Sequence, residues 1–136
     1  MSLELAHSMG ELWTACEKSI TYCSWMQARN TKEFIDSLKN EIRELETEID
    51  HGDEENIQEE AGDVLYVTLT LLLLAQKEYG INLPQLMDNI VEKLRRRKPF
   101  IFENRMVSKE EAEKLWQEAK RKEKLMTKKS EPQDEY

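Results

Sequence analysis

The sequence contains little of what disulfide-linked and all-β domains depend on. Among its 136 residues there are two cysteines, three prolines and four glycines, and aromatic residues make up 7%. An all-β sandwich needs a turn signal about every eight to twelve residues, so the scarcity of glycine and proline excludes that class. Cys16 and Cys23 are seven residues apart, which is about 10 Å along one helix and too far for a disulfide bond. Two free thiols suit a reducing compartment, and we therefore expect a cytoplasmic protein.

Long hydrophobic runs are also absent. The longest apolar stretch, residues 64–75, is too short to cross a bilayer, so we expect no membrane association. Glu4 and Glu11 interrupt the first residues, and we expect no secretory signal peptide there. Hydrophobic residues make up 39% and charged residues 35% of the chain. This composition predicts a helical protein whose single-chain core is small, and we expect oligomerisation to bury more surface.

The charge changes sign along the chain. The formal net charge is −8, yet residues 1–92 hold 19 acidic and six basic side chains, whereas residues 93–136 hold nine acidic and 14 basic ones. Between Glu41 and Asp63 there are 11 carboxylates and one base, Arg43. Such a surface attracts divalent cations, and we expect no binding of nucleic acid to it. The alternative is that the acidic run is only a solvated helix face.

Hydrophobic periodicity and helix caps predict five helices. Asn30 or Thr31 can cap the second helix after a connection over residues 22–30, and Gly52 separates it from a third helix that ends at Gly80. The third helix is apolar nearly all round at residues 64–74, so we expect it to be buried on every side, partly by a second subunit. A fourth helix begins near Pro84, and a capping box at residues 108–111 opens a fifth. We thus predict an all-α, four- to five-helix bundle over residues 1–124, assembled as a homo-oligomer, and a disordered charged tail over residues 125–136.

Four carboxylates share a symmetry about Gly52. Glu41 and Glu44 lie on one face of the second helix, and Glu60 and Asp63 lie on one face of the third. If the chain folds back at Gly52, Glu41 becomes level with Asp63, and Glu44 with Glu60. Four anions this close repel one another unless they are protonated or bind metal. Oxygen ligands favour Mg²⁺, with Mn²⁺ as a substitute.

A second cluster is basic and follows at the end of the fourth helix. It comprises Lys93, Arg95, Arg96, Arg97 and Lys98. Cations compensate the helix dipole at this end, but five of them exceed that need. Arginine binds phosphate oxygens with two parallel hydrogen bonds, so phosphate binding is the more specific interpretation of this basic cluster.

The order and spacing of these elements resemble the MazG-type pyrophosphohydrolases of the all-α nucleoside triphosphate pyrophosphatase superfamily. The family's E-x-x-E, E-L-G-D and K-L-x-R-R-x-P-H-V-F correspond here to residues 41–44, 60–63 and 93–102. Cys23-Ser24-Trp25 looks like the family's C-P-W, and residues 116–120 look like its W-E-x-I-K. The resemblance covers about residues 10–124.

The resemblance implies Mg²⁺-dependent hydrolysis of a (d)NTP to (d)NMP and pyrophosphate by an all-α homodimer or a dimer of dimers. The implied metal ligands are Glu41, Glu44, Glu60 and Asp63, and the implied substrate-binding residues are Lys93, Arg96, Arg97, Trp25, Trp116 and Lys120. Lys93, Arg96 and Arg97 would bind the phosphates, and Trp116 and Lys120 would close over the nucleotide. Trp25 and Trp116 could stack on the base. As a hypothesis, a free carboxylate oxygen of Glu41 or Glu44 takes the proton of the attacking water.

The sequence departs from the family at the nucleotide pocket. Ser24, Met26 and Asn30 stand where the family has proline, aspartate and glutamine, and Phe100-Ile101 replaces its His-Val. Base and sugar specificity therefore stay open. The alternatives are a narrow-specificity relative acting on dUTP, dCTP or phosphoribosyl-ATP, and a catalytically idle helical dimer that binds nucleotide or a protein.

Overall fold

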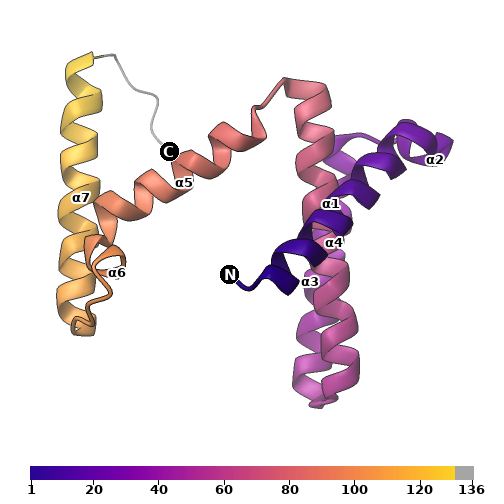
Figure 1. Ribbon diagram of the computed structural model, residues 1–136, viewed down its shortest axis with the longest axis horizontal. Helices are drawn as coiled ribbons and strands as arrows, with labels where there is room; N and C mark the ends of the chain where they lie inside the picture. The colour runs from indigo at the N-terminus through magenta and orange to yellow at the C-terminus, as the bar shows by residue number, and fades with distance from the viewer. Residues whose placement is uncertain (131–136) are drawn as a thin grey trace. The chain divides into compact units, whose positions relative to one another are not determined.

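The computed structural model describes residues 1–130, which form helices and no strand (Figure 1). The helices are α1 (Leu3–Tyr22), α2 (Ser24–Gln27), α3 (Thr31–His51), α4 (Glu54–Tyr79), α5 (Leu83–Arg97), α6 (Pro99–Phe102) and α7 (Lys109–Ser130). They belong to two compact units, Met1–Leu83 and a second one that begins at Pro84. The all-α class is confirmed. The oligomeric assembly and the domain limit at residue 124 stay predictions.

Helices α3 and α4 form an antiparallel hairpin, and side chains cap both of its helices. Asn30 Oδ1 accepts a hydrogen bond from the amide of Glu33 (2.9 Å) and so begins α3. Gly52 ends α3 in the left-handed conformation, with φ of 74°. Asp53 Oδ1 then accepts hydrogen bonds from the amides of Glu55 and Asn56, both at 3.1 Å, and begins α4. The predicted caps and the predicted break are therefore confirmed, and the two helices lie side by side (Figure 1).

Replacing Gly52 by alanine should lower the free energy of unfolding by about 1 kcal/mol. An L residue is strained at positive φ, and open space around the position leaves no packing to offset that strain. Gly10→Ala is the matched control, since Gly10 lies inside α1 and also has open space around it. It should raise stability by roughly 0.5–1 kcal/mol, because alanine favours helix. Urea unfolding measures both changes, and equal effects of the two substitutions would contradict the prediction.

The core of the first unit lies where α1, α2 and α3 meet α4. One buried cluster comprises Met26, Phe34, Val67 and Leu74, and the other comprises Cys16, Leu73 and Leu83. Cys16 is buried and Cys23 half-buried, and both thiols are free, as the spacing predicts. Burial raises the pKa of the Cys16 thiol, so it stays protonated and packs as an apolar side chain.

Helix α4 is buried over part of its surface by the rest of the first unit, and the predicted burial of the remainder by a second subunit stays a prediction. Val67, Thr70 and Leu74 face the core, whereas Leu65 and Tyr66 are 46% and 38% exposed. The first unit supplies α1, α2 and α3 against α4, too few neighbours to surround its apolar centre. Within residues 1–130 no single helix is long and apolar enough to cross a membrane, and α4 and α5 meet that criterion only when taken together across the break between them.

The second unit consists of α5, α6 and α7. Ser108 Oγ accepts a hydrogen bond from the amide of Glu111 (3.1 Å), which confirms the predicted start of the last long helix. Helix α6 was not predicted, and neither was α2. Each has only four residues, less than the periodicity of a buried face requires, so hydrophobic spacing could not reveal them.

Helix α7 continues to Ser130, beyond the point where we predicted the disordered tail to begin. The segment from Lys120 onward is rich in lysine and glutamate and contains Leu125 and Met126, all of which favour helix. No glycine or proline interrupts it before Pro132. The rest of the predicted tail, residues 131–136, lies outside the described residues.

Candidate metal and phosphate-binding residues

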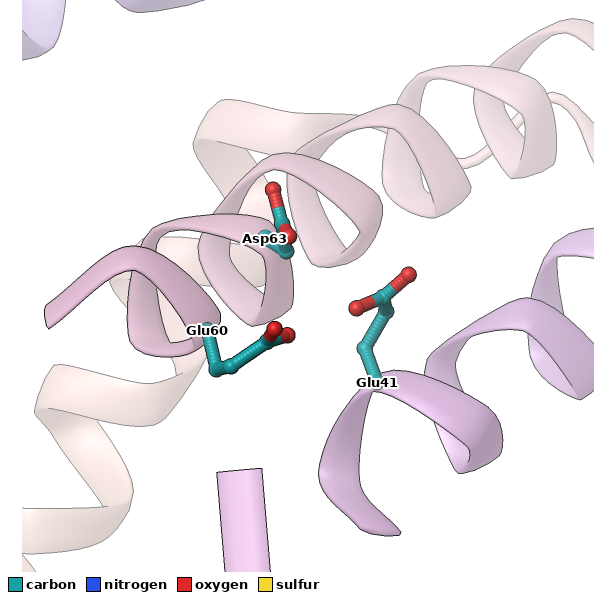
Figure 2. Close-up of side chains that lie close together, drawn as sticks. All are labelled: Glu41, Glu60 and Asp63. Atoms are coloured by element: carbon teal, nitrogen blue, oxygen red, sulfur yellow. The ribbon is translucent and has the colours of Figure 1, made fainter. Parts of the chain in front are cut away.

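The α3–α4 hairpin brings carboxylates from both helices to one place. Glu41 extends from α3, and Glu60 and Asp63 extend from α4, one turn apart (Figure 2). One carboxylate oxygen from each lies within 4.8 Å of the others. Figure 2 shows the three side chains directed toward a shared space between the helices. The reversal of the chain at Gly52 therefore produces the convergence that its sequence symmetry predicts.

Glu44 adjoins this group as a fourth carboxylate. It interacts with both Glu41 and Glu60, through its negative charge and through side-chain hydrogen bonds. All four acidic residues singled out in the sequence thus belong to one electrostatic cluster.

The pKa values of two of these carboxyl groups are raised. Burial raises the pKa of Glu41 above its ordinary value of 4.5, and the hydrogen bond and charge of Glu44 and the charges of Asp63 and Glu60 raise it further. The pKa of Glu60 is raised as well, and burial is again the largest cause. The charge and hydrogen bond of Glu44 and the charges of Asp63 and Glu59 raise this pKa further. No cationic side chain is among the groups that shift either pKa. Without a cation, Glu41 and Glu60 therefore hold their protons more tightly than isolated carboxyl groups would.

The cluster suits a hard divalent cation. Glu41 Oε2 and Glu60 Oε2 are buried and have no hydrogen-bond partner among the described residues. A buried carboxylate oxygen without a partner is costly, and a bound cation would remove that cost. An all-oxygen donor set favours Mg²⁺ or Mn²⁺ over zinc. The residues present fit the predicted ion type.

The basic residues belong to the second unit, and two of the three predicted phosphate ligands carry an unpredicted partner. Arg96 Nε donates to Glu123 Oε1 (2.8 Å), and Arg97 Nη2 donates to Glu123 Oε2 (2.9 Å). The pKa of Glu123 is lowered, chiefly by the hydrogen bond from Arg97. Burial acts in the opposite direction, whereas the hydrogen bond from Arg96 and the positive charges of both arginines lower the pKa further. Lys93, the third predicted ligand, is exposed. The two arginines are thus held by a carboxylate on α7 rather than lying free.

The two tryptophans both lie beside cations. Trp25 is 59% exposed, with the Arg29 guanidinium 4.6 Å from its ring centre and Phe34 edge-on at 6.5 Å. Trp116 is half-buried on α7, with the Arg97 guanidinium 4.9 Å and Lys98 Nζ 5.4 Å from its ring centre. A positively charged side chain therefore already lies within cation–π distance of each ring.

Lys120, the last predicted substrate-binding residue, is exposed on α7. It lines a surface pocket with Gln117, Arg121 and Lys124. The pocket carries three positive charges. Its lining does not include Lys93, Arg96 or Arg97.

Sequence reasoning missed Glu123. It lies in a run of charged residues, 120–124, that gives no sign of a particular partner. One signal was present: Glu123 follows Trp116 by seven residues, two helical turns, so the two share a face of α7. Arg97 contacts both.

Comparisons with known proteins point to one family. The model of the MazG nucleotide pyrophosphohydrolase domain matches residues 29–102. The crystal structure of a MazG-related protein from Thermotoga maritima is similar, with a TM-score of 0.80 and 35% sequence identity. The alignment covers 82% of this chain and 98% of that one. No curated protein matches the chain.

Proposed function

Because the chain belongs to the MazG nucleotide pyrophosphohydrolase family, we propose that it hydrolyses nucleoside triphosphates to nucleoside monophosphate and pyrophosphate with the help of Mg²⁺. The observation that carries this proposal is the convergence of Glu41, Glu60 and Asp63 within 4.8 Å. The matched residues 29–102 contain this group and the basic run at the end of α5. The matched region thus includes both the residues proposed to bind the metal and those proposed to bind phosphate, which supports the proposal.

Each acidic residue has a role in the proposed reaction. Glu41, Glu60 and Asp63 hold the cation, with Glu44 as a fourth ligand or as its neighbour. A bound Mg²⁺ supplies charge neutralisation for the triphosphate and acidifies a water molecule. A carboxylate oxygen of Glu41 or Glu44 that is not engaged by the cation accepts the proton of the attacking water. That residue must be ionised when the water attacks.

The cationic and aromatic residues bind the nucleotide in this proposal. Lys93, Arg96 and Arg97 bind phosphate oxygens, and Lys120 adds positive charge. Trp25 and Trp116 offer ring faces on which a base can stack. The proposal also includes a homodimer or a dimer of dimers, which the exposure of Leu65 and Tyr66 on α4 supports.

The decisive experiment is a panel of NTPs and dNTPs incubated with the full chain and Mg²⁺, with the products separated by anion exchange. We expect nucleoside monophosphate and pyrophosphate in equal amounts, and no turnover in EDTA. Nucleoside diphosphate and orthophosphate would contradict the proposed position of cleavage. The ranking of substrates tests the narrower alternative of a dUTP, dCTP or phosphoribosyl-ATP pyrophosphatase.

Absence of turnover with both Mg²⁺ and Mn²⁺ would favour the second candidate, a catalytically idle binding protein. The retained carboxylate cluster argues against that candidate, because its buried, unpartnered oxygens serve no evident structural purpose. Nucleotide binding without hydrolysis, measured by calorimetry, would identify it.

A further inference from the structure

Glu123 bridges two of the arginines to which the proposed function assigns phosphate binding. Its carboxylate takes one hydrogen bond from each, at 2.8 Å to Arg96 Nε and 2.9 Å to Arg97 Nη2. The side chains are 25% exposed for Glu123, 16% for Arg97 and 53% for Arg96. The bridge is therefore partly shielded from water, where charge-assisted hydrogen bonds keep more of their strength than they do at a fully exposed surface.

Arg97 is held from a second side as well. Its guanidinium lies 4.9 Å from the centre of the Trp116 ring, while its Nη2 bonds to Glu123. Because Trp116 and Glu123 are two turns apart on α7, the helix presents ring and carboxylate together. A guanidinium bound at its face and at one edge cannot rotate freely.

The bridge leaves both arginines able to bind an anion. A guanidinium has five N–H donors, and each arginine donates one hydrogen bond to Glu123. Three ionised groups with one negative and two positive charges keep a net positive charge. Arg96 is also more than half exposed, so its remaining donors are accessible to a phosphate.

We propose that Glu123 is a positioning residue for triphosphate hydrolysis, which orients Arg96 and Arg97 so that both guanidiniums meet the phosphates in one geometry. The inference rests on the proposed function. Arginine carries large rotamer freedom, and restricting it before the substrate binds lowers the entropy lost in the transition state. The opposite role, in which Glu123 occupies the phosphate site and must be displaced, predicts that its removal accelerates the reaction.

The test is Glu123→Gln in the full chain, beside Glu113→Gln as a control with the same charge change at an exposed position of α7. We expect kcat to fall about tenfold in Glu123→Gln while KM stays equal or decreases, because orientation is lost but an anion beside the phosphates is removed. Glu113→Gln should behave as the native chain. In an Arg96→Gln background, Glu123→Gln should add less than its own tenfold loss, since one of the two arginines through which it acts is gone.

Three kinetic results would overturn the inference: an increase of kcat/KM in Glu123→Gln, equal behaviour of both variants, and full additivity with Arg96→Gln.

A second measurement needs neither variant nor turnover. The arginine Nε–H resonances of the native chain are followed by NMR during titration with inorganic pyrophosphate. We expect the Arg96 and Arg97 signals to shift together at the same pyrophosphate concentration, and no shift of either would contradict the inference. Absence of NTP turnover in the native chain, with this shift intact, would refute the proposed function and the role of Glu123 in hydrolysis, but would leave phosphate binding by Arg96 and Arg97 in place.

Discussion

Glu60→Gln is expected to lower kcat for pyrophosphate release by at least about a hundredfold, with little change in fold. The substitution keeps the size of the side chain and removes one anionic oxygen ligand. Glu60 has a buried Oε2 that finds no hydrogen-bond partner in the part of the chain that the structure describes, and its neighbours Glu44 and Asp63 are carboxylates. An amide there can still hydrogen-bond, but it contributes no negative charge to a cation. Mg²⁺ affinity, measured by calorimetry, should fall together with kcat.

Glu46→Gln is the matched control, because Glu46 lies exposed on α3 outside the group of converging carboxylates. It changes the net charge equally and should keep kcat within about a factor of two. Thermal melts in EDTA separate loss of function from loss of fold. The Glu60→Gln chain should melt at or above the temperature of the native chain, since one repulsive charge has gone. Full turnover in Glu60→Gln would refute the metal assignment.

The hairpin could be predicted because local signals and long-range geometry agree in it. Three residues determine the ends of these helices. The side chains of Asn30 and Asp53 accept hydrogen bonds from backbone amides at the start of α3 and α4, and Gly52 ends α3 in the left-handed conformation. Such effects depend on only a few neighbouring residues. Once the turn is known, the 1.5 Å rise per residue decides which residues of the two helices are level. The convergence of Glu41 with Glu60 and Asp63 follows from these two facts alone.

The environment of the basic residues could not be predicted in the same way. Arg97 and Glu123 are 26 residues apart, on different helices. Their contact depends on the connection through α6, a four-residue helix that hydrophobic periodicity does not reveal. The sequence predicts that cations gather at the end of α5, but not which carboxylate pairs with them.

Burial of α4 shows a second limit of prediction from the sequence. An apolar run at residues 64–74 predicts that the whole circumference avoids water, but it does not say which neighbour covers each side. Within the first unit, α1, α2 and α3 pack against α4 and leave Leu65 and Tyr66 exposed. The same run is compatible with burial inside a larger chain or against a second one. Only the positions of the neighbouring helices distinguish these cases.

Stabilisation by Mg²⁺ should increase with pH, because the ion and protons compete for the same carboxylates. The folded chain raises the pKa values of Glu41 and Glu60 above 4.5, whereas the unfolded chain does not. Above pH 4.5 the metal-free folded state therefore holds more protons at these groups than the unfolded state does. Their contribution to stability is then present at lower pH and is lost as the pH rises through their folded pKa values. Bound Mg²⁺ replaces those protons and removes this penalty.

Melting temperatures in Mg²⁺ and in EDTA, compared between pH 5 and pH 8, measure this linkage. At ten times its dissociation constant at the upper pH, Mg²⁺ should add about 1.4 kcal/mol, which is about 5 °C for a chain of this length, and clearly less at pH 5. The double variant Glu41→Gln/Glu60→Gln is the control, since it removes both titrating groups. It should show almost no difference between Mg²⁺ and EDTA at any pH. A difference that is independent of pH, or that persists in the double variant, would place Mg²⁺ binding elsewhere on the acidic surface. A pH-dependent difference confined to the native chain would tie the ion to Glu41 and Glu60 without reference to turnover.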